Sequence, residues 1–400
     1  MIILKSNNFF LTFENLHEYS KKMAEKTAEE HYTEGNSLAL NKEYVDALRS
    51  YEEAIRLDPS HLKSWIAKGK LLINVLALRE ALDCFSKAIE IAPDCIECLL
   101  EIASIHTSQG DYDEALKIYD KLIVSHPSNK EAYIGKGWAL YRSGRPDESL
   151  ETLENILSIN PRDDSVWYAK GMVLFEMGEY EEALSAIDRS ISLNPGNDDV
   201  WAKKIEVELK SGRIDDAIRT YDALIMRRPD DAEVRYMKAG LLYEKNNYEK
   251  ALQACDAAIA ITRDYIDAWE LKGKILANLN REKEALSSFD FALSMNLASA
   301  TAWEGKRHIY EKLYDMENAN RSIDMLILID PKNCEYWKDK GKYLYRLKRN
   351  EEARQAVGIA NSLLNQAKEE KEQSLGKKKI DPDYINDEIE DITFDEDEII

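Results

Sequence analysis

Side chains of similar size recur along this chain at an interval of 34 residues. In most intervals a large residue is followed four positions later by a small one and, three positions after that, often by leucine. Residues spaced i, i+4 and i+7 lie on one face of an α-helix. The pattern therefore predicts one helix per interval, built on the large residues Trp65, Leu99, Tyr133, Trp167, Trp201, Trp269, Trp303 and Trp337 and the small residues Gly35, Gly69, Ala103, Gly137, Gly171, Ala239, Gly273 and Gly341.

A second helix is predicted in each interval. Twelve positions after the small residue, alanine stands in nine of ten intervals and Ser149 in the other, and an aromatic residue such as Tyr51 or Phe85 often follows. Between the two helices several intervals carry glycine, which readily adopts the left-handed conformation that ends a helix. These glycines are Gly110, Gly144, Gly178 and Gly212. Small residues on both helices predict that the two axes approach closely.

The interval holds without a register shift through ten units, which we place at 28–61, 62–95, 96–129, 130–163, 164–197, 198–231, 232–265, 266–299, 300–333 and 334–367. Each helix pair leaves one face apolar, and only the neighbouring pair can cover it. We therefore predict an all-α stacked array over residues 28–367. Residues 1–27, with a helix near Leu16–Lys26, are expected to cap the first unit, and residues 368–400 to form a charged helix and an acidic tail.

The order of large residue, glycine or alanine, leucine, alanine, aromatic, alanine and proline resembles the tetratricopeptide repeat (TPR). This resemblance implies a right-handed superhelical solenoid of antiparallel helix pairs, whose concave groove is lined by the first helix of each pair. It also implies a scaffold or adaptor that binds a partner peptide or domain in that groove. The chaperone-tail clamp of some family members is not reproduced, because Tyr32 and Asn36 are followed by Ala67, Glu97 and Glu101.

Carried over by position, the groove of units four and five is unusually aromatic. It comprises Ile134, Trp138, Tyr141, Arg142, Tyr168, Met172, Phe175 and Glu176. These side chains either pack against adjacent helices or form a wall that anchors a partner segment. Units eight to ten carry mixed charge at the same positions, which favours specificity over affinity: Glu270, Lys274, Glu304, His308, Glu311, Lys312, Lys338, Lys342 and Arg346.

Net charge excludes some partner classes. The chain has 75 acidic and 54 basic residues, a net charge of −21, so a nucleic-acid partner is not expected. No apolar run is long enough to cross a membrane. Five cysteines in 400 residues argue against a disulfide framework and favour a cytoplasmic location. The sequence predicts a protein partner without identifying it, and it does not predict the oligomeric state.

No catalytic, metal-binding or cofactor-binding motif is evident, and the segments flanking the repeats are too short for an active-site core, so we do not expect an enzyme. Cys95 and Cys98 form a C-x-x-C sequence. Two interpretations remain open for this pair, namely metal or redox chemistry and ordinary packing.

Several positions depart from the repeat. In eight units a lysine stands directly before the small residue: Lys68, Lys136, Lys170, Lys204, Lys238, Lys272, Lys306 and Lys340. Either the aliphatic part of each lysine covers apolar surface while its ammonium stays in water, or the lysines form a ladder of positive charge that binds an acidic ligand. Ile205, Glu208 and Arg307 are bulky where small or apolar residues are expected. They are expected to separate the paired helices or point outward, and one of them could act as a hinge. Units seven and eight lack the closing proline, so units six to nine are expected to be the most flexible.

The last 21 residues hold ten acidic residues and no basic one. This composition is typical of a disordered, solubilising tail. A second interpretation is that the tail docks on a basic partner or on the groove of its own chain. It gives an alternative function, in which the chain is a regulatory subunit that acts on an enzyme or transcription complex through its acidic tail.

Overall fold

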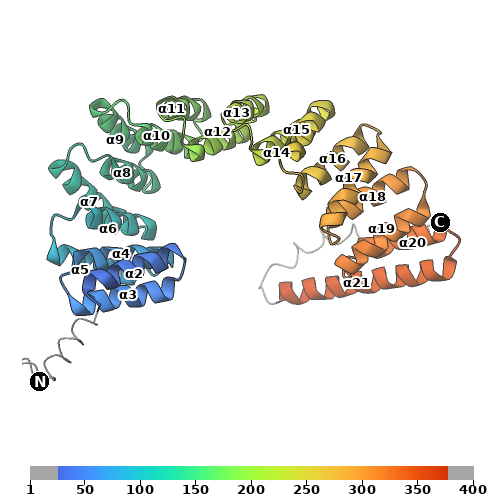
Figure 1. Cartoon of the computed structure of the whole chain (residues 1–400), viewed down its shortest axis with the longest axis horizontal. Coiled ribbons are helices and arrows are strands. Elements are labelled where there is room, and N and C mark those ends of the chain that lie inside the picture. The colour runs from blue at the N-terminus through green and yellow to red at the C-terminus, as the bar shows by residue number, and fades with distance from the viewer. Residues whose placement is uncertain (1–25, 377–400) are drawn as a thin grey trace, which may run out of the picture. The chain divides into compact units, whose positions relative to one another are not determined.

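A computed structural model describes residues 26–376, with side chains to residue 368. Within this range the chain forms 20 α-helices and no strand (Figure 1). The predicted N-terminal helix and the acidic tail lie outside the described residues. The chain divides into two compact halves, one ending at Ser211 and the other beginning at Gly212. We call them the N-terminal half and the C-terminal half, and each is described by itself.

The N-terminal half contains eleven described helices, each packed against the next along the chain. They are α2 (Ala28–Leu40), α3 (Tyr44–Leu57), α4 (Leu62–Asn74), α5 (Leu78–Ile91), α6 (Ile96–Gln109), α7 (Tyr112–Ser125), α8 (Lys130–Arg142), α9 (Pro146–Ile159), α10 (Asp164–Glu176), α11 (Tyr180–Leu193) and α12 (Asp198–Lys210). Even-numbered helices also contact one another, as α2 with α4, α6 with α8 and α8 with α10.

The C-terminal half contains nine described helices, and again each packs against the next along the chain. They are α13 (Ile214–Arg227), α14 (Ala232–Glu244), α15 (Tyr248–Ile261), α16 (Ile266–Asn278), α17 (Glu282–Met295), α18 (Ala300–Lys312), α19 (Met316–Ile329), α20 (Cys334–Arg346) and α21 (Asn350–Gly376). Each of the ten predicted intervals begins with a helix and contains the start of two, and the all-α, pairwise-packed fold is confirmed. The exact repeat boundaries stay a prediction.

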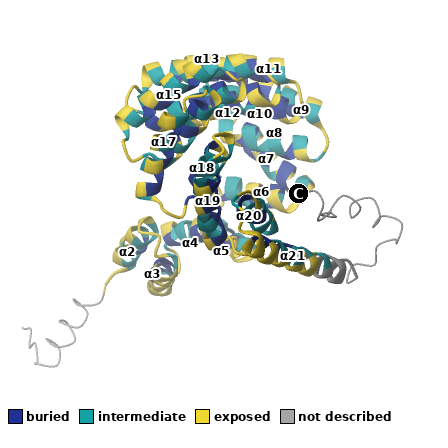
Figure 2. Ribbon diagram, turned by 90° about the vertical axis from the view of Figure 1, so that its right-hand side faces the viewer, coloured by how far each residue is buried: buried dark blue, intermediate teal, exposed yellow. Residues whose placement is uncertain are grey.

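The close approach of paired helices follows from the small residues. A Cβ added at Gly35 would lie 2.6 Å from the Tyr51 ring, and one added at Gly273 would lie 2.6 Å from the Phe289 ring. The nine periodic alanines are all buried. Ser149, the exception, is also buried and donates from Oγ to the Gly137 carbonyl at 2.7 Å. Many helices in Figure 2 carry buried and exposed residues together.

The turn between paired helices needs a left-handed residue in every unit. Gly110, Gly144, Gly178 and Gly212 have φ between 75° and 88°, as predicted. The other six units place non-glycine residues at the same position with φ between 55° and 64°: Lys42, Leu76, Asn246, Asn280, Tyr314 and Lys348. These residues take a conformation that a side chain disfavours, which shows that the position, rather than glycine itself, is required.

The recurring tryptophan has a polar role as well as an apolar one. In six units the indole N–H donates to the backbone carbonyl six residues earlier, at 2.8 to 3.0 Å. In units eight and nine this acceptor belongs to Arg263 and Leu297 instead of proline. The same connection therefore closes units seven and eight, which lack the proline, although the predicted flexibility of this stretch is untested.

All eight lysines of the predicted ladder are ion-paired. Each contacts an acidic residue 16 positions earlier, on the preceding helix pair, at 2.5 to 2.9 Å. Four of them also lie 4.9 to 5.7 Å from the ring of the tryptophan three positions earlier. This arrangement supports the packing interpretation, because each ammonium already has an anionic partner. A charged ladder awaiting an acidic ligand is not observed.

The bulky departures are accommodated inside the units. Ile205 and Glu208 are buried, and the Glu208 carboxylate lies 3.8 Å from the Lys204 ammonium. The Arg307 side chain is 12% exposed and reaches the next pair, where Nη1 donates to the Tyr343 hydroxyl at 2.9 Å. None of the three points into solvent, so the second of the two expected outcomes, an outward-turned side chain, does not occur. The separation of the paired helices and the proposed hinge stay predictions.

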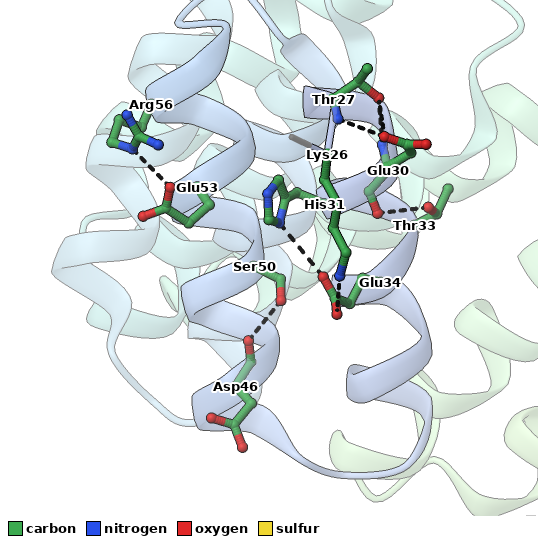
Figure 3. A network of polar contacts seen from close by, with 10 residues as sticks. All are labelled: Lys26, Thr27, Glu30, His31, Thr33, Glu34, Asp46, Ser50, Glu53 and Arg56. Carbon is green, nitrogen blue, oxygen red and sulfur yellow. Dashed lines mark hydrogen bonds and ion pairs between the residues drawn. The ribbon is translucent and has the colours of Figure 1, made fainter. Parts of the chain in front are cut away.

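The described chain starts with a well-capped helix. The Thr27 side chain accepts from the Glu30 backbone N–H, and the Thr27 backbone N–H donates back to the Glu30 carboxylate (Figure 3). This reciprocal pair is the capping box, which satisfies backbone donors that a helix start leaves free. The Lys26 ammonium donates to Glu34 at 2.7 Å, and this hydrogen bond lowers the pKa of Glu34.

Candidate functional site

The eight residues predicted to line the groove lie on two neighbouring helices of the N-terminal half. Ile134, Trp138, Tyr141 and Arg142 are on α8, and Tyr168, Met172, Phe175 and Glu176 are on α10. We call this set the aromatic face. The two helices contact each other directly, so the structure brings the predicted residues onto adjacent helices.

Contacts within the aromatic face hold several of these side chains in place. The rings of Trp138 and Tyr141 meet edge to face with centroids 6.1 Å apart, a geometry that aromatic pairs prefer. The Tyr141 hydroxyl donates to the Glu176 carbonyl at 3.1 Å, which ties the end of α8 to the end of α10. Ile134, Trp138 and Tyr141 also pack, half-buried, against a core cluster that includes Leu153.

Burial divides the aromatic face. Met172 and Phe175 are only 7% and 6% exposed, and the ammonium groups of Lys203 and Lys210 lie 5.8 and 5.0 Å from the Phe175 ring. A partner could touch little of either side chain.

The rest of the face remains accessible to different degrees. Tyr168 is half-buried, and burial raises its pKa. Arg142 and Glu176 are exposed. The surface left for a partner therefore consists of the half-buried rings and these two charges.

The C-terminal half contains a small cavity that the sequence pattern does not predict. It has a volume of about 180 Å³ and is formed by α14, α16, α17 and α18, with lining residues Tyr243, Lys274, Ala277, Asn278, Glu282, Phe289, Gly305, His308, Ile309 and Lys312. We call it the α16–α18 cavity. Sites for drug-sized molecules usually measure 300 to 1,000 Å³, so this volume suits a single side chain or terminal group.

The α16–α18 cavity has apolar walls and a polar rim. Phe289 and Ile309 are almost fully buried, whereas Lys274, His308 and Lys312 are exposed. The Lys312 ammonium is partly engaged, since it donates to Glu282 at 2.8 Å. No ion pair joins the Lys274 ammonium to another residue in the described range.

Two further hydrogen bonds orient polar groups at the rim. The Asn278 amide donates to the Tyr243 hydroxyl at 3.2 Å. Arg307 donates to His308 Nε2 at 2.9 Å, which leaves His308 Nδ1 to carry the ring proton. The rim therefore offers an ammonium and an imidazole N–H, both suited to an anionic group.

One small residue lies beside the cavity where other units carry a larger one. Ala277, which lines the cavity, occupies the repeat position of Tyr141 and Phe175, whereas the space beside Gly305 is filled by the Phe289 ring, because a Cβ added there would lie 2.2 Å from it. The signal was present in the sequence as one small residue, but periodicity alone does not report a missing side chain. The mixed charges predicted for units eight to ten do include Lys274, His308 and Lys312.

Beside the cavity, α18 and α20 share a partly buried polar cluster. Arg307 lies 3.2 Å from Asp339 and 3.4 Å from Glu311, and the Tyr343 hydroxyl donates to Glu311 at 3.2 Å. Burial raises the pKa of Tyr343 to about 12, so the phenol stays protonated. These hydrogen bonds and ion pairs link α18 to α20, although the buried Arg307 Nε has no hydrogen-bond partner among the described residues.

Other site classes are not supported among residues 26–368. No cluster of three or more potential metal ligands occurs there, and none of the described helices is long and apolar enough to cross a membrane. Cys95 and Cys98 are paired as a disulfide, and Cys98 is fully buried in a core cluster, so neither interpretation of the pair is excluded.

Comparison with known families gives matches along much of the chain. Models described as tetratricopeptide repeat match residues 28–61, 66–130, 174–241 and 209–275, about half of the chain in total. A model described as anaphase-promoting complex, cyclosome, subunit 3 matches residues 108–190.

Individual relatives match over short stretches. A CTR9 homolog from Arabidopsis thaliana is 30% identical over 95 residues, 24% of this chain and 9% of that protein. Hsp70-Hsp90 organizing protein 1 from Glycine max is 28% identical over 110 residues, 28% and 19% of the two chains. A probable peptide N-acetylglucosaminyltransferase, SPINDLY, from Hordeum vulgare is 31% identical over 97 residues, 24% and 10%. The matches thus span less than a fifth of these relatives' lengths.

Among solved structures, a tetratricopeptide repeat protein from Parabacteroides merdae is similar to this chain. It has 18% sequence identity and a TM-score of 0.42, and the alignment covers 62% of this chain and 98% of that chain.

Proposed function

Since the chain belongs to the tetratricopeptide repeat family, we propose that it is a non-enzymatic scaffold that binds a segment of a partner protein along the first helices of its repeats. TPR domains are in general protein-binding modules. The observation that carries the proposal is the α16–α18 cavity, where three first helices converge on a hollow of about 180 Å³. The partner segment would insert one side chain there.

The chemistry of the cavity supports one kind of inserted side chain. Apolar walls at Phe289 and Ile309 favour an aliphatic stem, and the ammonium of Lys274 favours a carboxylate at its end. A glutamate side chain meets both requirements. Binding energy at such interfaces is concentrated in a few anchoring residues placed in pockets, so we place the anchor of the partner segment here.

The aromatic face is a second contact surface in this proposal. Trp138 and Tyr168 keep part of their rings accessible, and tryptophan and tyrosine are frequent anchors at interfaces. Met172 and Phe175 would act as support beneath them, because both are buried. The face contributes area and the cavity contributes selectivity.

The experiment begins with peptides selected from a random display library on the immobilised full chain. Their affinity is then measured by fluorescence polarisation for the wild type and for Ala277→Phe, which fills the cavity, and Lys274→Glu, which reverses the rim charge. We expect both variants to weaken binding at least tenfold, equivalent to about 1.4 kcal/mol. Acidic residues should be enriched among the selected peptides.

Two control variants make the outcome specific. Lys283→Glu reverses an exposed charge on α17 outside the cavity lining and should leave affinity unchanged. Trp138→Ala tests the aromatic face alone. If the cavity variants bind normally while Trp138→Ala loses affinity, the anchor lies on the aromatic face instead. If no peptide is selected, binding of a peptide segment is contradicted.

A further inference from the structure

Cys95 and Cys98 lie at the start of α6, where the second and third helix pairs meet. Cys95 is the N-cap residue and Cys98 is in the first helical turn. The two residues form a disulfide with Cα atoms 5.4 Å apart, within the range that disulfides require. We propose that this pair is a thiol–disulfide exchange site whose reaction partners are small-molecule thiols and their disulfides, such as reduced and oxidised glutathione.

The two sulfur atoms differ in access, and this difference sets the order of reaction. Cys98 is completely buried in a core cluster with Phe85 and Ala88. Cys95 is half-buried and packs at the edge of the same cluster. An incoming thiolate therefore reaches the Cys95 sulfur, and Cys98 is the leaving and resolving thiol.

The local backbone favours a reactive Cys95. The Cys98 backbone N–H donates to Cys95 Sγ at 3.3 Å, and the start of a helix stabilises negative charge. Cysteines placed at helix starts and in C-x-x-C sequences are the ones whose thiolates form most readily. Only two residues separate the cysteines, so the bond closes a minimal loop and gains little from restricting the unfolded chain.

The exchange balances in two steps. In reduction, a thiolate attacks Cys95 Sγ and breaks the bond to Cys98, which leaves as a thiolate and takes up a proton. A second thiolate then attacks the external sulfur of the mixed disulfide, forming the small-molecule disulfide and releasing Cys95 as a thiolate, which also takes up a proton. Overall the protein disulfide gains two electrons and two protons, and two small thiols become one disulfide. Oxidation by the small disulfide is the reverse sequence.

The remaining described cysteines provide an internal comparison. Cys84 and Cys255 are buried and unpaired, and burial raises the pKa of Cys84 to about 11 and of Cys255 to about 12. Neither should react in the folded chain. Cys334 is half-buried and unpaired, so it reports simple accessibility without a partner sulfur.

The site joins two core clusters, so its redox state bears on how the pairs pack. Cys95 and Cys98 belong to the cluster around Phe85, while Ile96 and Leu99 on the same first turn pack against the next cluster, around Tyr119. Opening the disulfide removes a covalent restraint at this junction. Exchange here would therefore alter local stability without removing an apolar contact.

The test uses the full chain equilibrated in glutathione buffers of stepped thiol-to-disulfide ratio, then alkylated and analysed by peptide mass spectrometry. We expect Cys95 and Cys98 to change from protected to alkylated together, with a two-electron dependence on the ratio. Cys84 and Cys255 should stay unlabelled throughout, and Cys334 should be labelled without a matching transition. Cys98→Ser should trap glutathione on Cys95, whereas Cys95→Ser should trap none on Cys98.

Three outcomes would overturn the proposal. The pair could stay free in the most oxidising buffer, or it could stay closed in the most reducing one, which would make it a purely structural disulfide. A Cys98→Ser variant that folds, by circular dichroism, yet forms no mixed disulfide would remove the assigned role of Cys95. Cys334→Ser serves as the matched control and should leave the transition of the pair unchanged.

Discussion

The aromatic face of the N-terminal half and the α16–α18 cavity of the C-terminal half occupy equivalent positions of the repeat, yet they are built in opposite ways. Where α8 and α10 carry Tyr141 and Phe175, α16 carries Ala277. The large rings fill their own surroundings and become half-buried or buried, whereas the small residue leaves a hollow. Aromatic residues at groove positions are therefore an ambiguous sign of binding, because they also satisfy themselves by packing.

Phe175→Ala should produce the largest change, because it converts the filled position into one like Ala277. Phe175 is 6% exposed, and truncating a buried phenylalanine to alanine typically lowers the free energy of unfolding by about 3 to 5 kcal/mol. The measurement is urea unfolding followed by far-UV circular dichroism. A loss under about 1 kcal/mol would mean that the ring is a surface group and that the contrast between the two regions is false.

Gly305→Ala and Gly240→Ala form a matched pair on α18 and α14 and should act in opposite directions. A Cβ at Gly305 would overlap the buried Phe289 ring, whereas one at Gly240 meets nothing within 4 Å. We expect Gly305→Ala to destabilise by about 1 to 3 kcal/mol. Gly240→Ala should stabilise by about 0.5 to 1 kcal/mol, since glycine is unfavourable within a helix.

Thermal unfolding of both glycine variants checks this expectation. Equal effects would show that helix propensity alone governs the two sites and that the Phe289 ring can move freely. Opposite effects would show that the cavity wall is rigidly packed.

Lys210→Ala and Lys274→Ala should give the smallest effects and separate a covering lysine from an unengaged one. The Lys210 ammonium lies 5.0 Å from the Phe175 ring, a contact worth about 0.5 to 1 kcal/mol. Lys274 is exposed at the cavity rim, so its removal should change stability by less than about 0.5 kcal/mol. A stability loss for Lys274→Ala as large as that for Lys210→Ala would argue that the rim lysine serves folding rather than binding.

Periodicity was sufficient to predict the helix pairs, because it depends only on side-chain size at fixed spacing. Gly35 facing Tyr51 and the left-handed Gly110 follow directly from that pattern. The pairing of Lys170 with Glu154 could not be derived in the same way, because it joins different helix pairs and depends on how they pack. Sequence spacing identifies faces of a helix, but contacts between helices require their relative orientation.

The functional predictions were less complete for a related reason. A pattern records which residues are present, so Phe175 was noticed and the space beside Ala277 was not. The Cys95–Cys98 pair was noticed, but spacing alone could not show that the two sulfur atoms lie together. Sites made by absence and sites made by side-chain direction both need coordinates.

The recurring indole hydrogen bond also determines what can be seen by spectroscopy. Six of the seven tryptophans, from Trp65 to Trp337, share the hydrogen bond from the indole N–H to a backbone carbonyl, and Trp138 is the exception. These six lie in both halves of the chain. Intrinsic emission from the whole chain therefore averages over nearly equivalent chromophores and cannot tell which junction melts first. A derivative that keeps a single indole, with phenylalanine at the other six sites, would turn the same fluorescence into a local thermometer for one chosen junction.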